Sequence, residues 1–289
     1  MKTLLTLILV CGLVISSSSA QTSRTASKML YHNGPVLTGI QDVYVIWYGC
    51  WNNCGQMGDS KTQLVVSDFL STIGNTPYMQ INLTYPNSAG VAPTGSFVYG
   101  GSVFDSYSHG YRDLTDADIQ GIISDQITSF QLPHDPQGIY VVIASSDVAS
   151  NETNFCTPGA PPYHGRAVIF GAMTSYIFLG NPNRCPSAAG PQFIGSAGTQ
   201  LPTPHDSFAG DALASNLAHA LSTTVTNPLG NAWFDRYGLE NADKCQNTFG
   251  QTYLTANGAT ANLRLPSAGD YLIQQNWVND RKGRCAMSP

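Results

Sequence analysis

Apolar runs and helical patterns alternate along the chain. Five apolar runs predict strands; they lie at residues 43–48, 96–104, 139–145, 167–179 (with an interruption) and, more briefly, 273–278. Residues 61–72 and 117–130 instead place apolar side chains at helical spacing. Thr115 can cap the second helix, and Asp116 and Asp118 suit a helix N-terminus, where carboxylates are favoured. The alternation indicates an α/β (α+β) fold with a mixed β-sheet and flanking helices.

The clearest helical pattern covers residues 211–226. It combines an apolar stripe, which predicts burial, with a separate polar stripe. The apolar stripe is Leu213, Leu217, Leu221 and Val225, and the polar stripe is Asn216, His219, Thr223 and Thr226. Pro228 ends the helix, because proline cannot continue it. His219 is the titratable side chain of the polar stripe and is therefore the first candidate for chemistry.

A histidine on such a helix suggests the frame of a zincin metal site. That site needs a glutamate directly after the histidine to activate water, and a second ligand one helical turn further on. Here Ala220 occupies the position of the base and Thr223 that of the second ligand. Alanine cannot move a proton, and threonine is a poor zinc ligand. We therefore expect a degenerate zincin-like frame, with His219 partly buried and hydrogen-bonded to neighbouring threonines or backbone.

The alternative is a metal centre of unusual composition. Glu240 and Asp243 follow the helix and could supply oxygen ligands beside His219, which would make His219 and Glu240 the catalytic candidates and zinc the cofactor. One histidine with two distant carboxylates is a weak ligand set, so we expect no cofactor.

The other histidines are scattered beside glycine or proline in expected loops. His164, in Tyr163-His-Gly-Arg166, could contribute to a site, but a histidine in a loop is usually a surface residue, and we expect this of His164. The sequence has neither a Gly-x-Ser-x-Gly elbow nor a phosphate-binding loop of the Walker type.

The first 20 residues have the features of a secretory signal peptide: Lys2, an apolar run at 4–15, and a small-residue cleavage site that ends at Ala20. We expect residues 21–289 to form a single domain. No later segment reaches the roughly 18 apolar residues of a membrane span.

Six cysteines remain after the signal, and an even number in an oxidising compartment indicates three disulfides. Spacing leaves their connectivity open, and we expect neighbours in sequence to pair: Cys50–Cys54, Cys156–Cys185 and Cys245–Cys285. Asn82 and Asn151 begin Asn-x-Thr sequons and are candidate glycosylation sites.

The charge balance argues against two classes of partner. Of 13 Lys and Arg residues, Lys2 lies in the signal, which leaves 12 against 18 Asp and Glu. We identify no basic run, so nucleic acid and anionic membranes are not expected partners. Fourteen tyrosines and four tryptophans could form a sugar-stacking face, although most fall in expected core strands.

With these residues in view, the chain resembles the phosphate-induced protein 1 family, whose plant members are called EXORDIUM and EXORDIUM-like proteins. The most specific blocks are Tyr31-His-Asn-Gly-Pro-Val-Leu-Thr-Gly39 and Thr224-Val-Thr-Asn-Pro228. Further blocks lie at residues 43–49, 65–69, 140–148, 155–156 and 180–186, so the resemblance spans nearly the whole mature chain.

The resemblance implies a secreted protein of the extracellular matrix or cell wall (the apoplast in plants), associated with growth and cell expansion and without an established reaction. Distant relatives that look like metallohydrolases carry His-Glu where this chain has His219 and Ala220, and an acidic residue at the position of Thr223. This sequence departs from them at both positions, as the plant members do.

We therefore expect a non-catalytic protein that acts through binding or signalling, with a cell-wall polysaccharide or an extracellular protein as its partner. Two alternatives stay open. One is a zincin-like peptidase with an atypical site at His219, Glu240 and Asp243, and the other is a dedicated binder of cell-wall polysaccharide.

Overall fold

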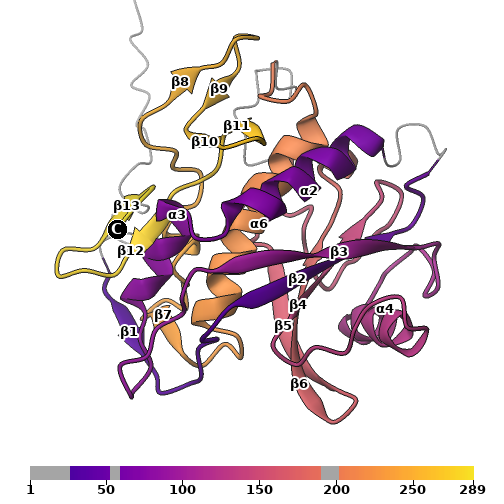
Figure 1. Cartoon of the computed structure of the whole chain (residues 1–289), viewed down its shortest axis with the longest axis horizontal. Coiled ribbons are helices and arrows are strands. Elements are labelled where there is room, and N and C mark those ends of the chain that lie inside the picture. Colours follow the sequence, from indigo (N-terminus) through magenta and orange to yellow (C-terminus); the bar gives the residue numbers. More distant parts are fainter. Residues whose placement is uncertain (1–26, 53–58, 190–201) are drawn as a thin grey trace, which may run out of the picture.

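A five-stranded mixed sheet forms the centre of the molecule (Figure 1). The computed structural model describes residues 27–52, 59–189 and 202–289. The strand order is β3-β2-β4-β6-β5, with bounds β2 Gln41–Tyr48, β3 Phe97–Asp105, β4 Ile139–Ala144, β5 Tyr163–Ile169 and β6 Ala172–Leu179. The first four strands in this order are parallel, and β5 runs antiparallel to β6 at one edge. The predicted mixed sheet is confirmed.

The strands expected at 43–48, 96–104 and 139–145 are present with small differences at their ends. The run at 167–179 is instead a hairpin, because Phe170 and Gly171 turn the chain with φ of 49° and 79°. The expected run is therefore divided into two strands, and the first of them begins at Tyr163, before the expected start at residue 167. His164 therefore lies in a strand, and its expected place in a surface loop was wrong.

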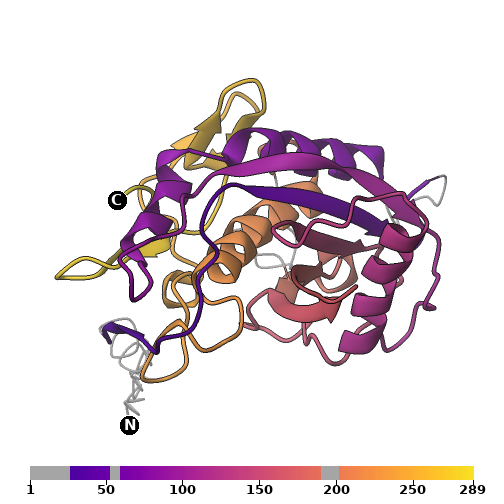
Figure 2. The same cartoon turned by 60° about the horizontal axis from the view of Figure 1, so that its bottom comes forward.

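Helices cover both faces of the sheet, as Figure 2 shows. The side chains of β2 alternate between the two faces, which is the period of a strand. Val43, Val45 and Trp47 pack in one core with helices α2 (Ser60–Ile73) and α6 (Phe208–Thr226). Tyr44, Ile46 and Tyr48 pack in a second core with helix α4 (Asp116–Thr128). β2 is thus buried on both sides, which explains its continuous apolar sequence.

The three long helices begin at side-chain caps. Thr115 and Asp118 form a reciprocal capping box at α4, which confirms their predicted place at a helix start. Asp59 caps α2. Ser207 caps α6, so this helix begins at Phe208, three residues before the predicted start. Almost the whole surface of α6 is buried, including His219, Thr223 and Thr226 of its polar stripe, so the imidazole and hydroxyl groups of these residues need partners inside the protein. Asn216, the fourth residue of the stripe, is half-buried.

Short elements surround the two cores. Four two-stranded ribbons are β1 Met29–Tyr31 with β7 Trp233–Asp235, β8 Tyr253–Leu254 with β9 Thr260–Ala261, β10 Leu263–Leu265 with β11 Gly269–Tyr271, and β12 Asn276–Val278 with β13 Arg284–Ala286. The short helices are α3 Pro77–Gln80, η2 Ile81–Thr84, η3 Pro182–Arg184, α5 Pro186–Ala189 and η4 Asp243–Cys245. The strand expected at 273–278 is reduced to β12.

Two of the three expected disulfides are confirmed: Cys156–Cys185 and Cys245–Cys285. Cys50 is disulfide-bonded, but its expected partner Cys54 lies outside the described residues. Among the helices of the described segments, none has the length and apolar character to cross a bilayer.

The two sequons differ in accessibility. Asn82 is fully buried, and its side-chain oxygen accepts a hydrogen bond from Asn241. The fold leaves no room for a glycan on a side chain in this position, so the expectation for Asn82 is corrected. Asn151 is exposed, and glycosylation there stays a prediction.

His205 joins the start of α6 to the β10–β11 ribbon. Its Nδ1 lies 2.6 Å from Oδ1 of Asp211, and its Nε2 lies 3.0 Å from the carbonyl oxygen of Ala268. The ring also packs against Tyr271, with 4.5 Å between ring centroids. A carboxylate and a carbonyl can only accept, so both ring nitrogens donate. His205 is therefore held as an imidazolium.

This geometry predicts a pH-dependent stability. Burial is the largest influence and lowers the pKa of His205, but the hydrogen bond and charge of Asp211, together with Ala268 and Asp270, raise it above its ordinary value of 6.5. A raised folded-state pKa contributes stability that is complete below the unfolded pKa and is lost as pH rises through the folded one. We expect the free energy of unfolding, measured with urea from about pH 5 to about pH 9, to fall across this window. His205→Gln should flatten the fall, and an unchanged pH profile in that variant would contradict the assignment.

Candidate functional site

The centre of the candidate site is His219 on α6, which is 2% exposed. Its Nε2 lies 2.9 Å from Oδ1 of Asp243, and its Nδ1 lies 2.9 Å from Nε2 of Gln274. The same amide nitrogen of Gln274 lies 3.0 Å from the carbonyl oxygen of Ala242. Three segments that are distant in sequence thus meet at one imidazole.

These contacts determine the protonation of His219. The carbonyl of Ala242 can only accept, so the atom of Gln274 that faces it must be the amide nitrogen. The second hydrogen of that nitrogen points to Nδ1 of His219, which must therefore accept. The ring proton then lies on Nε2 and is donated to Asp243. His219 is a neutral imidazole with both nitrogens engaged.

A second histidine–carboxylate pair adjoins the first. Nε2 of His164, on β5, lies 2.9 Å from Oε2 of Glu240, and both side chains are at most 13% exposed. The other oxygen of Glu240 accepts a hydrogen bond from Asn227. The backbone N–H of Glu240 donates to Oδ2 of Asp243 at 2.9 Å. Asp243 therefore links the two pairs into one buried cluster.

The cluster perturbs the acid–base equilibria of its members. Burial is the largest influence on His164 and lowers its pKa, but the charge and hydrogen bond of Glu240 and the charge of Asp243 outweigh burial and raise it. Burial likewise opposes ionisation of Asp243, but the hydrogen bond from His219 and further hydrogen-bond and charge interactions lower its pKa. Asp243 is thus stabilised in its charged form by the hydrogen bond from His219.

The structure brings together the three residues singled out in the sequence, His219, Glu240 and Asp243. His164 joins them; it was considered as a contributor to a site but expected at the surface, because its position in a strand was not recognised. The expected partners of His219 were wrong: Thr223 donates to the helix carbonyls of His219 and Ala220, at 3.3 and 3.1 Å, rather than to the imidazole. Such back-bonding is usual for a threonine inside a helix.

The residues present do not suit a metal. Nε2 of His219 donates a proton to Asp243 and Nδ1 accepts one from Gln274, so a metal would have to displace an existing hydrogen bond. In the described part of the chain, no group of three or more His, Cys, Asp or Glu side chains is arranged to hold a metal ion. The zincin-like frame is not confirmed.

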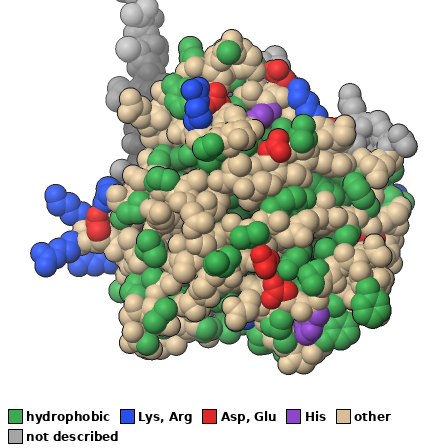
Figure 3. Space-filling model, viewed as in Figure 1, with side chains coloured by type: hydrophobic (Ala, Val, Ile, Leu, Met, Phe, Trp, Pro, Cys, Tyr) green, Lys and Arg blue, Asp and Glu red, His purple; other side chains and the backbone are tan. Residues whose placement is uncertain are grey.

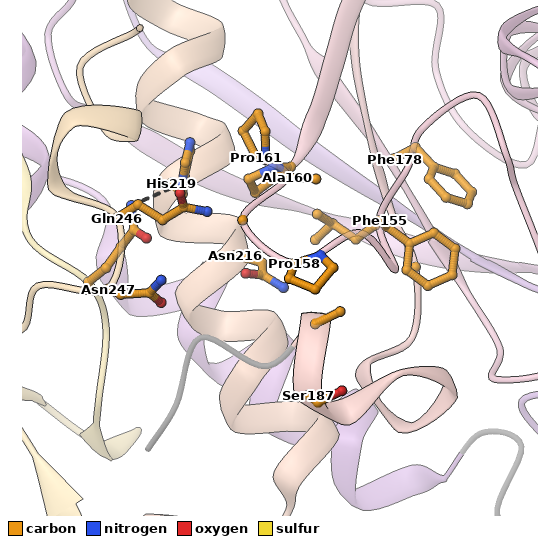
Figure 4. Close-up of a pocket in the computed structure, with 16 residues that line it drawn as sticks. Phe155, Pro158, Ala160, Pro161, Phe178, Ser187, Asn216, His219, Gln246 and Asn247 are labelled. Atoms are coloured by element: carbon orange, nitrogen blue, oxygen red, sulfur yellow. Dashed lines mark hydrogen bonds between the residues drawn. The ribbon is translucent and has the colours of Figure 1, made fainter. Parts of the chain in front are cut away.

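A cavity of about 170 Å³ opens beside His219. Figure 4 shows His219, Gln246 and Asn247 on one side of it, and Phe155 and Phe178 on the other. Its complete lining among the described residues is Phe155, Pro158, Gly159, Ala160, Pro161, Pro162, Phe178, Leu179, Gly180, Ser187, Ala188, Asn216, His219, Gln246, Asn247 and Gln274. Four of these side chains are amides, and none is a carboxylate, lysine or arginine. The cavity therefore offers neutral donors and acceptors beside apolar surfaces.

Two features hold the walls of the cavity. The Cys156–Cys185 disulfide joins the loop that carries Phe155 to the segment that leads into α5. Gly180 allows Phe155 to pack closely, since a Cβ at this position would lie 2.1 Å from the phenyl ring. The sequence signalled the disulfide but not the cavity, because the lining of the cavity comes from six separate segments.

Comparisons with known proteins agree on one family. A family model described as the phosphate-induced protein 1 conserved region matches residues 29–274. Protein EXORDIUM-like 5 of Arabidopsis thaliana is 27% identical over 294 residues, which cover 91% of this chain and 78% of the relative. Protein EXORDIUM-like 3 of the same plant is 29% identical over 291 residues, covering 91% and 84%. Protein PHOSPHATE-INDUCED 1 of Nicotiana tabacum is 27% identical over 269 residues, covering 85% and 77%. No solved structure matches the chain.

Proposed function

The chain belongs to the phosphate-induced protein 1 family, and we propose that it is a non-catalytic extracellular binding protein whose ligand site is the cavity beside His219. The proposed ligand is a short neutral oligosaccharide, such as a segment of a cell-wall polysaccharide. The role in growth or cell expansion that the family resemblance implies would then be exerted through binding or signalling.

The lining of the cavity is the observation that carries this proposal. Asn216, Gln246 and Asn247 present amides, which donate to and accept from hydroxyl groups without the desolvation cost of a charged group. Phe155 and the prolines of residues 158–162 supply apolar surfaces on which a sugar ring can pack. An uncharged, hydroxyl-rich ligand matches both kinds of surface.

The chemistry of α6 supports binding over hydrolysis. Ala220 stands where a general base would be needed. A general base typically raises the rate of a catalysed reaction by about 10²–10⁴-fold. His219 cannot take over this role without first breaking its hydrogen bond to Asp243 or Gln274. The signal-like residues 1–20 and the two described disulfides support an extracellular location.

Filling the cavity should weaken binding. Ala160 lines the cavity, and Ala160→Phe is expected to lower the affinity for neutral oligosaccharides by roughly tenfold or more, because the new ring occupies the space of the ligand. We would titrate the secreted protein with gluco-, xylo-, manno- and galacto-oligosaccharides and follow binding by calorimetry and NMR. Ala256→Phe, at an exposed alanine in a surface turn, is the matched control and should bind as the wild type does.

Two results would contradict the proposed function. The first is the absence of binding to every neutral oligosaccharide. The second is stoichiometric zinc in the purified protein that is lost in His219→Ala, together with hydrolysis of a peptide or glycan that a chelator abolishes. That second pattern would instead support the metallohydrolase hypothesis.

A further inference from the structure

A short basic segment lies at the turn of the β12–β13 hairpin. Three of the 12 Lys and Arg residues that follow the signal are Arg281, Lys282 and Arg284. The expectation that the chain has no basic run was wrong here. The run is short, and its side chains form a cluster only because a tight turn brings them together. Residues 280–284 are called the basic tip below.

Asp280 organises the basic tip. Its Oδ1 accepts hydrogen bonds from the backbone N–H groups of Lys282 at 2.9 Å and Gly283 at 2.7 Å, and its Oδ2 pairs with Arg284. Gly283 has a φ of 68°, and a Cβ on it would lie 2.3 Å from the ring of Trp277. The turn is thus closed by its own carboxylate and depends on glycine at one position.

The hairpin is also attached to the body of the protein. The backbone N–H of Asn279 donates to the hydroxyl of Thr84 at 3.1 Å, and the side-chain amide of Asn279 donates to the carbonyl of Thr84 at 3.2 Å. On the other strand, Cys285 is bonded to Cys245. The basic tip is therefore presented on a fixed base, which reduces the entropy lost when a partner binds.

Two cations of the tip are available to a partner. Arg281 and Lys282 are exposed, and within the described residues neither forms an ion pair. The acidic group next to them, Asp280, is already engaged by the turn and by Arg284. Figure 3 shows Lys and Arg side chains projecting together from the left edge of the molecule, while the rest of that face carries few charges.

We propose that the basic tip is a second binding surface, for a carboxylated polysaccharide. A guanidinium binds a carboxylate through two parallel hydrogen bonds, and the adjacent ammonium adds a mobile point charge. A polymer that repeats carboxylates along its chain can engage Arg281 and Lys282 together. This surface does not depend on the cavity beside His219.

Other polyanions fit the basic tip less well. Single-stranded nucleic acid is usually bound with aromatic side chains that stack on bases. The aromatic residue of this hairpin, Trp277, is 6% exposed and lies beneath Lys244. Attraction to anionic membranes usually takes about four to eight clustered Lys or Arg residues, and the tip has three.

The test compares two double variants of the whole secreted protein. Arg281→Gln with Lys282→Gln removes the two available cations and keeps the Asp280–Arg284 turn. Lys61→Gln with Arg112→Gln removes the same charge from exposed positions elsewhere and is the matched control. Binding to sodium polygalacturonate is measured by affinity electrophoresis, with dextran as the neutral polymer and a single-stranded DNA oligonucleotide as the alternative polyanion.

We expect polygalacturonate, but not dextran, to retard the migration of the wild type. This retardation should decrease as the salt concentration rises from about 50 to about 200 mM, because salt screens the charges. The tip variant should bind roughly 30-fold more weakly, and the control should bind like the wild type. Equal melting temperatures would show that both variants are folded. The proposal would be overturned if the wild type failed to bind, if both variants lost affinity equally, or if DNA bound more tightly than polygalacturonate. Since the tip variant leaves the cavity intact, failure here is distinguishable from failure of the proposed function.

Discussion

Asp235→Ala is expected to lower the free energy of unfolding by about 3–5 kcal/mol, because it leaves the ammonium of Lys244 buried without a counter-charge. The side chains of Lys244 and Asp235 are both 0% exposed, and their charged atoms lie 3.0 Å apart. The ammonium also donates to the carbonyl and hydroxyl oxygens of Ser27, at 2.7 and 3.1 Å, and lies 4.4 Å from the ring centroid of Trp277. Burial, the largest influence, lowers the pKa of Lys244, which reflects the cost of keeping this charge away from water.

The comparison variant is Lys244→Met, alone and combined with Asp235→Ala. Removing both charges leaves no isolated ion, so the double variant should be more stable than Asp235→Ala alone. Urea unfolding of the four proteins gives the interaction energy directly. A loss of less than about 1 kcal/mol in Asp235→Ala would mean that water reaches the ammonium, contrary to the geometry described.

The second large effect is expected from the disulfide that attaches the C-terminal hairpin. Cys245→Ala with Cys285→Ala opens a covalent loop that spans 40 residues, and the loss of this constraint on the unfolded chain is worth about 4 kcal/mol. Cys245 is also fully buried, so its truncation leaves unfilled space in the core. Thermal and urea unfolding would measure the loss.

Cys156→Ala with Cys185→Ala is the matched control, since it opens a loop of similar span, 29 residues, at an exposed cysteine. We expect it to cost less, because little buried volume is removed. The two double variants should also differ in function. The first should weaken polygalacturonate binding through the basic tip, and the second should weaken oligosaccharide binding in the cavity. The reverse pattern would contradict the assignment of the two surfaces.

The predicted parts of the fold rest on local signals. The continuous apolar sequences of β2 and β4 and the capping box of α4 are readable without tertiary information, and so is the even number of cysteines. The hairpin of β5 and β6 was not predicted, because a two-residue turn at Phe170 and Gly171 was read as an interruption of a single strand. Because of this error, His164 was expected in a surface loop. The antiparallel register instead places it opposite Ile177, and its Nε2 lies within hydrogen-bond distance of Glu240.

The sequence by itself determined which chemistry α6 lacks, since the alanine and threonine at positions 220 and 223 exclude a base and a good second ligand in any fold. It also named Glu240 and Asp243 as residues that could lie beside His219, but gave them only as distant carboxylates of an alternative site. Only the tertiary structure decided the protonation of His219, because Gln274 is 55 residues away from it in sequence. The same holds for Lys244, whose partner Ser27 is 217 residues away. Buried polar groups take whichever partners the packing of distant segments brings within hydrogen-bond distance, and no local pattern encodes that choice.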